Sequence, residues 1–154
     1  MHEKVILPFV KATIDCFATM VNVTPVKKEV TMQRPPIAQA DVCSLIGLSG
    51  DAQGLVAITF SNETAIKIAS QFLGENLKTL NEDTLDAVGE LINIIAGNAK
   101  ANLEGLKLSI SLPSVMLGEN FSLSMPRNVP VVTVSFAIPE MGDLILTVSL
   151  KKNG

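Results

Sequence analysis

The chain lacks tryptophan and tyrosine altogether and contains a single histidine, His2, among its 154 residues. Proteins that bind single-stranded nucleic acid stack bases on aromatic side chains, and six phenylalanines offer little for that purpose. A zinc site or histidine-based acid–base catalysis needs imidazole groups beyond one at the start of the chain. These shortages argue against stacking-based recognition of nucleic acid, against a resident metal and against a histidine-dependent enzyme.

Positive charge is also scarce and is not clustered. Twelve lysines and arginines face fifteen aspartates and glutamates, which leaves a formal net charge of −3. Binding to a nucleic-acid backbone normally requires a basic stripe. We therefore expect no nucleic-acid partner.

No run of about 18 apolar residues occurs, so a membrane span is not expected. The opening residues mix apolar and charged side chains and do not resemble a signal peptide. Cys16 and Cys43 lie in apolar surroundings without a CxxC spacing, which favours reduced core thiols and leaves a bridge between them open. Together these features predict a cytoplasmic protein without a membrane partner.

What the sequence does contain is apolar residues, at 47%, against only 18% charged residues. A chain of this length and composition can bury its own core, so residues 1–154 are expected to form a single domain. The apolar fraction is high enough that a second subunit could cover part of the surface.

Periodicity and turn residues predict an α+β fold in which helices pack on a mainly antiparallel sheet. An N-terminal helix is expected over Glu3–Met20, a central one between Ser61 and Gly74, and a longer one over Asp83–Leu103. Strands are expected at Val26–Met32, Asp41–Leu48, Gln53–Phe60, Leu106–Leu112, Ser114–Leu117, Val131–Ile138 and Leu144–Leu150. Arg34-Pro35-Pro36 is expected to interrupt the chain after the first strand.

The third predicted helix carries a narrow polar stripe. At roughly 100° per residue, Asp86, Asn93, Gly97 and Lys100 all fall within about 80° of Glu90 on one side. The opposite half of the helix is apolar and is made of Leu85, Val88, Leu91, Ile92, Ile95, Ala99 and Leu103. The stripe is therefore expected to face away from the core.

One interpretation of this stripe is an ordinary solvated helix face. Its composition favours a second interpretation, because Asn93, Gly89 and Gly97 all lower helix propensity without an evident structural benefit. The stripe also lacks the Glu–Lys pairs at i, i+4 that usually support an exposed helix. We expect the two glycines to leave room for another molecule to approach the helix backbone.

The pattern Asp86-x-x-x-Glu90-x-x-Asn93-x-x-x-Gly97, followed by Asn98-Ala99-Lys100, resembles the signature helix of the CheC/CheX/FliY family of chemotaxis phosphatases. The expected order of helices and strands resembles CheX over nearly the whole chain. CheC-type members resemble a tandem arrangement with two signature helices. Here the other central helix has Glu63 followed by Ile66 where asparagine would be needed, so one motif is present, as in CheX-like proteins.

The resemblance implies a hydrolase that removes the aspartyl phosphate of a phosphorylated CheY-like receiver domain. The receiver carries its own Mg²⁺, so no cofactor or metal of this chain is expected. An amide such as Asn93 can hold the attacking water without bringing negative charge toward the phosphate. Glu90 would pair with the receiver's active-site lysine, which the resemblance supplies.

Three further residues of the stripe are expected to contact the partner. Gly97 would allow close approach, and Lys100 would either meet acidic receiver surface or stay solvated. Asp86 is either a rim contact or a favourable charge near the start of the helix.

Two other functions remain open from the sequence. One is a CheX-like module that binds a receiver or belongs to a flagellar switch without turnover, because a fold does not fix a function. The other is a dimeric domain that senses a small ligand in a cleft beside a hairpin. A homodimer is implied by the resemblance and agrees with the apolar N-terminal helix and the aliphatic C-terminal hairpin. An enzyme with its own nucleophile is disfavoured, since Ser61, Ser114 and the cysteines have no histidine to activate them apart from His2 at the start of the chain.

Overall fold

The computed structural model of the chain describes residues 3–31, 40–121 and 128–153. Its helical elements are α1 (Glu3–Cys16), the π-helical turn η1 (Phe17–Val21), α2 (Asn62–Leu73) and α3 (Glu82–Ala101). Its strands are β1 (Val26–Thr31), β2 (Ala40–Gly50), β3 (Ala52–Phe60), β4 (Leu108–Ile110), β5 (Ser114–Phe121), β6 (Val131–Ile138) and β7 (Gly142–Lys152).

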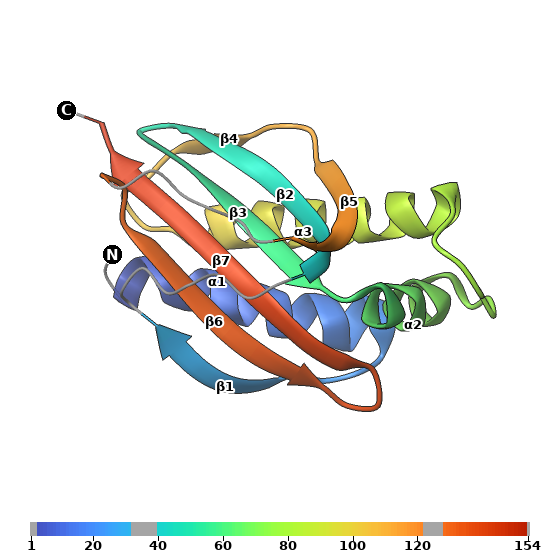
Figure 1. Ribbon diagram of the computed structural model, residues 1–154. Helices are drawn as coiled ribbons and strands as arrows, with labels where there is room; N and C mark the ends of the chain where they lie inside the picture. Colours follow the sequence, from blue (N-terminus) through green and yellow to red (C-terminus); the bar gives the residue numbers. More distant parts are fainter. Residues whose placement is uncertain (1–2, 32–39, 122–127, 154) are drawn as a thin grey trace.

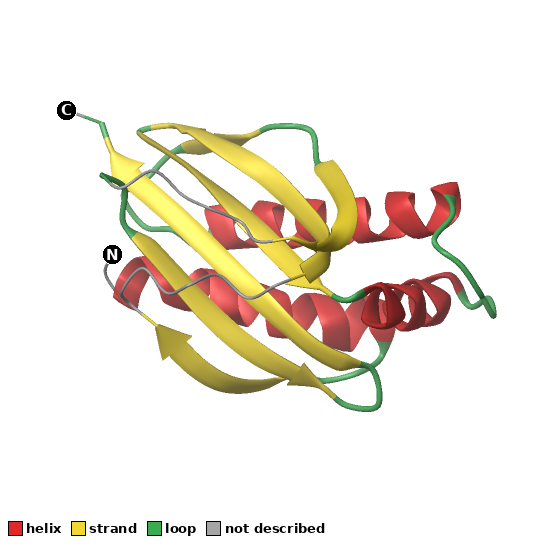
Figure 2. Cartoon of the chain, viewed as in Figure 1, coloured by secondary structure: helices red, strands yellow, loops and turns green. Residues whose placement is uncertain are grey.

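Within these residues the strands form one seven-stranded sheet in the order β1-β6-β7-β3-β2-β4, with β5 also paired to β2. Every pairing is antiparallel. The helices lie together on one face of the sheet (Figure 1) and form a layer against it (Figure 2). The predicted α+β class with a mainly antiparallel sheet is therefore confirmed.

The core lies between the helix layer and the sheet. Side chains at alternate positions of the central strands join one buried cluster with apolar residues of α1 and α3. Its strand members include Val56, Ile58, Val132, Val134, Phe136, Leu144, Leu146 and Val148, and its helix members include Phe9, Leu91, Ile92 and Ile95. The cluster members of α3 run from Val88 to Ala99, and this part of the helix packs against the sheet and α1.

Local capping residues explain where α2 begins and ends. Ser61 precedes the helix in an extended conformation, and its side chain accepts a 3.1 Å hydrogen bond from the backbone N–H of Thr64. At the other end Gly74 adopts φ +68°, a left-handed conformation that favours glycine. The predicted limits of this helix are confirmed.

The remaining element predictions hold in outline, with differences at the ends. The regular N-terminal helix stops at Cys16 rather than Met20, and a π-helical turn follows it. The predicted strand at Leu106–Leu112 is shorter, since only Leu108–Ile110 pair with β2. The strand predicted to end at Leu117 continues to Phe121, whose register partner is Ala40. The predicted break at Arg34-Pro35-Pro36 lies outside the described residues.

The C-terminal hairpin, β6 and β7, lies in the middle of the sheet rather than at its edge. Its apolar residues on the helix side, such as Val134, Phe136 and Leu146, are buried in the core beneath the chain's own helices. The aliphatic character of the hairpin is therefore explained within one chain and does not argue for a second subunit.

Candidate active-site helix

Helix α3 is fixed at its start by a capping box. The side-chain oxygen of Asn81 accepts a 3.0 Å hydrogen bond from the N–H of Thr84, whose hydroxyl accepts one of 3.2 Å from the N–H of Asn81. Glu82 and Asp83 occupy the first turn, where negative charge is favourable beside the helix N-terminus. The helix thus begins at a residue set by its own sequence.

The back of α3 is packed as the periodicity predicts. Val88, Leu91, Ile92, Ile95, Ala99 and Leu103 are buried, and Leu85 is half-buried. Two side chains from other elements also bond to its backbone: the Ser44 hydroxyl donates to Val88 O at 2.8 Å, and the Cys16 thiol donates to Leu91 O at 3.8 Å. These two bonds tie α3 to the sheet and to α1 at the turn that carries Glu90.

The opposite side of α3 presents the predicted stripe. Asp86 and Glu90 are exposed, while Asn93 and Gly97 are half-buried. Residues three apart on a helix are neighbours, with about 5–6 Å between their Cβ atoms, so Glu90 and Asn93 can reach one small group together. Within the described residues, neither side chain makes a hydrogen bond or ion pair. The carboxylate and the amide are both available to a partner.

The two glycines of the helix differ in their surroundings. A Cβ at Gly97 would meet nothing within 4 Å, so the backbone there is open to approach. A Cβ at Gly89 would lie 3.6 Å from Val115 Cγ2 and 3.8 Å from Pro113 Cγ. The expectation that both glycines admit a partner is therefore wrong for Gly89, because the start of β5 covers it.

Lys100 is half-buried, and its ammonium donates a 3.3 Å hydrogen bond to the carbonyl oxygen of Leu108 on β4. An ammonium group has three donors, so this bond leaves others for a partner. Lys100 thus ties the end of α3 to the sheet, and its contact with a receiver stays a prediction.

Both thiols are buried and free, as expected for core cysteines. Burial, reinforced by the negative charge of Glu90, raises the pKa of the Cys16 thiol to about 12. Burial raises the pKa of the Cys43 thiol to about 11. Neither thiol is suited to act as a nucleophile near neutral pH.

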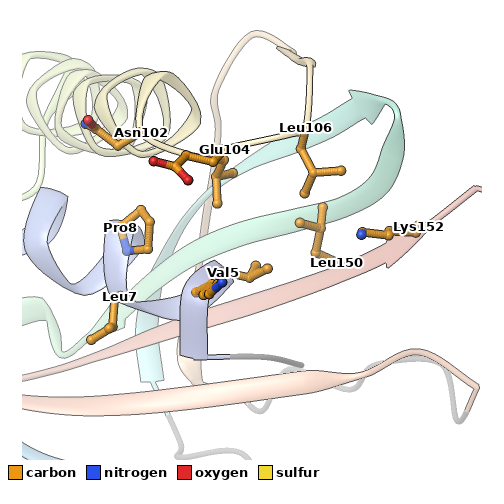
Figure 3. A pocket seen from close by; sticks show the side chains of 10 residues that line it. Val5, Leu7, Pro8, Asn102, Glu104, Leu106, Leu150 and Lys152 are labelled. Carbon is orange, nitrogen blue, oxygen red and sulfur yellow. The ribbon is translucent and has the colours of Figure 1, made fainter.

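A separate hollow of about 680 Å³ lies beyond the other end of α3 (Figure 3). Leu106 and Leu150 point toward each other across it, and Glu104 and Lys152 carry charge at its rim. Asn102, on its helix side, follows Glu90 by about 18 Å at 1.5 Å per residue. The hollow is therefore remote from Glu90, although Lys100 at the far end of the stripe lies close to it in sequence.

In the described ranges there is no cluster of three or more His, Cys, Asp or Glu side chains that could hold a metal ion. Among the same residues, no helix is both long and apolar enough to cross a membrane.

Comparison with known proteins bears directly on this helix. Residues 42–137, which include all of α3, match the family described as chemotaxis phosphatase CheX. The CheY-P phosphatase CheX of Thermotoga maritima is 32% identical over 108 residues, which span 68% of this chain and 70% of that protein.

Solved structures agree with the sequence relationship. The chemotaxis protein CheX of Desulfovibrio desulfuricans superposes with a TM-score of 0.88 at 30% identity, covering 96% of this chain and 99% of that one. CheX of Borrelia burgdorferi, solved in a complex of CheX, CheY, BeF3 and Mg²⁺, has the same fold, with a TM-score of 0.81, 24% identity and coverage of 96% and 98%. The chain belongs to the CheX family of chemotaxis phosphatases.

Proposed function

We propose that this chain accelerates hydrolysis of the aspartyl phosphate of a CheY-like receiver domain by docking α3 against the receiver's active site. The observation that carries the proposal is the placement of Glu90 and Asn93, unengaged and one turn apart on the outer side of a fixed helix. A named CheY-P phosphatase among the relatives and a CheX solved together with CheY support the choice of partner.

The step that needs help is attack of water on phosphorus. The water oxygen forms a bond to phosphorus as the bond from phosphorus to the aspartyl oxygen breaks, which releases inorganic phosphate and restores the carboxylate. Phosphoryl transfer depends mainly on positioning and on placement of charge. The Asn93 amide oxygen accepts a hydrogen bond from the water and holds it in line, and Mg²⁺ on the receiver balances the phosphate charge.

Glu90 has a different role, because a carboxylate in contact with the phosphoryl group would be repelled. It needs a cation, and the receiver's active-site lysine is the partner that fits. A charge-assisted pair of this kind sets the register of docking. Asp86 and Gly97 extend the contact along the same stripe, and Lys100 lies one turn further on.

The test is the rate of phosphate release from a phosphorylated receiver of the same organism. Asn93→Ala is expected to lower kcat on the order of a hundredfold, because the water loses its holder. Glu90→Gln is expected to raise KM about tenfold with a smaller change in kcat. Gln71→Ala, an exposed residue of α2 outside the signature pattern, serves as the control.

Parent-like rates for both Asn93→Ala and Glu90→Gln would overturn the assignment. Receiver binding without any acceleration by the parent would favour the alternative of a non-catalytic docking module.

We also propose that the protein forms a homodimer. Met20, Val26 and Val30 expose apolar surface at and beyond the end of α1, at 38%, 55% and 39% of their accessible area. Light scattering on the purified protein tests this, and a monomer at micromolar concentration would contradict it.

A further inference from the structure

The connection between β4 and β5 forms one flank of α3. In Figure 1, β5 crosses the middle of α3, and the two elements are in contact. Pro113 and Val115 pack over Gly89, the residue before Glu90, and Lys100 bonds to β4 on the same side of the helix. Asn93 falls on this side of the stripe, so a protein that docks over Asn93 comes close to the β4–β5 connection.

Leu112 stands in this connection with 87% of its surface exposed, far more than the other exposed large apolar side chains of the described residues. Its backbone is nevertheless held in place. Ser111 N donates to Gly47 O at 3.0 Å, Gly47 N donates to Ser111 Oγ at 2.8 Å, and Ser111 Oγ donates to Leu112 O at 2.9 Å. An apolar side chain on a fixed backbone loses little conformational freedom when a partner covers it.

Strand β5, which follows Leu112 in the chain, adds apolar side chains on the helix side of the sheet. Val115 and Leu117 lie opposite Ser44 and Val42, two residues whose side chains face the helix layer, so they lie on the helix side of the strand as well. Leu117 is 50% exposed. We name Leu112, Pro113, Val115 and Leu117 the apolar shoulder.

The fully exposed charges of α3 beside the shoulder are all negative, whereas Lys100 is half-buried and bonded to β4. Glu82, Asp83, Asp86 and Glu90 are all exposed along α3. A partner that covers both surfaces must offer a cation together with apolar side chains. A second copy of this surface fits poorly, because two-fold pairing would bring these acids toward their own counterparts.

We propose that the apolar shoulder is the second half of the receiver-docking surface and receives apolar side chains next to the receiver's active-site lysine. This inference rests on the proposed function and adds a determinant of partner choice to it. Glu90 sets the register through charge, and Leu112 supplies contact area that depends on which receiver is bound. Asn93 alone acts on the water, so loss of the shoulder weakens binding without slowing the bound complex.

The experiment compares Leu112→Asn with Leu7→Asn, an exposed leucine of α1 near the remote hollow. The Kd for a receiver loaded with Mg²⁺ and BeF3⁻ is measured by titration, and KM and kcat by phosphate release. Leu112→Asn is expected to raise Kd and KM about tenfold with kcat within about twofold of the parent. Leu7→Asn is expected to match the parent in all three.

An unchanged Kd for Leu112→Asn, in a protein whose Asn93→Ala variant has lost activity, would overturn the shoulder and leave the proposed function standing. Conversion of a dimer to a monomer by Leu112→Asn would show that the shoulder binds a second copy, which also overturns the inference. If the parent neither binds the loaded receiver nor releases phosphate from it, both proposals are wrong.

Discussion

The hydroxyl of Ser44 on β2 donates a 2.8 Å hydrogen bond to the carbonyl oxygen of Val88 on α3, and both groups are buried. Val88 precedes Glu90 by two residues, so the bond fixes the height and rotation of the helix against the sheet. It links residues that are 44 positions apart in the sequence.

Ser44→Ala is expected to lower the free energy of unfolding by about 1 kcal/mol, because one buried hydrogen bond is lost while the Val88 carbonyl can keep its helical partner. Urea unfolding followed by circular dichroism measures the change. Ser49→Ala, exposed near the end of the same strand, is the control and is expected to match the parent. Equal stabilities for both variants would show that the bond contributes nothing.

The two helix glycines make a matched pair, because the same substitution is expected to lower activity at one of them and not at the other. Gly89→Ala and Gly97→Ala are each expected to raise the free energy of unfolding by about 0.5–1 kcal/mol, because alanine favours a helix and neither new methyl group clashes. Only Gly97→Ala is expected to lower kcat/KM, because its methyl group would stand on the open surface that the receiver is proposed to approach. Thermal unfolding and phosphate release check both parts, and equal activity of the two variants would contradict the assigned role of Gly97.

The burial of both thiols predicts that the folded protein protects them from chemical modification. With pKa values of about 12 and 11 against an ordinary 9.0, Cys16 and Cys43 hold very little thiolate at pH 8. Modification by a disulfide reagent is expected to be slower than in guanidinium by roughly a hundredfold or more. The Cys16→Ala and Cys43→Ala variants show which thiol reacts at which rate. Rapid modification of the folded protein would contradict the burial of both thiols.

The same pKa shifts determine how the free energy of unfolding changes with pH. A thiol whose pKa is raised by folding contributes its full stabilisation below the unfolded value of 9.0, and this is lost as the pH rises toward 11 and 12. Between pH 8 and pH 10.5, the urea concentration at the unfolding midpoint is expected to fall less for Cys16→Ala than for the parent.

The sequence predicted most of the fold because its signals are local. Ser61 and Gly74 mark the ends of α2 by capping, and the spacing of Val88, Leu91, Ile92 and Ile95 marks the buried side of α3. What it could not predict depends on contacts between distant residues. Strand β5 extends to Phe121 because it pairs with the start of β2, and Asp41 accepts the N–H of Asn120 at 2.9 Å.

The candidate site shows the same division. Helical spacing placed Asp86, Glu90, Asn93 and Gly97 on one outward side of α3, and the structure has them there. The sequence does not predict the flank formed by Leu112 and Pro113, because Pro113 indicates only the end of a strand. Gly89 was misassigned for the same reason: its neighbour in space is 24 positions away in sequence, counted from Gly89 to Pro113.

The capping box of Asn81 and Thr84 has a consequence for association. Because α3 is closed at its start by its own side chains, the docking surface proposed for this helix does not have to fold on the receiver. Complex formation then involves no coupled folding of that helix and little loss of backbone entropy. Encounters with the proposed receiver can then be brief and still productive.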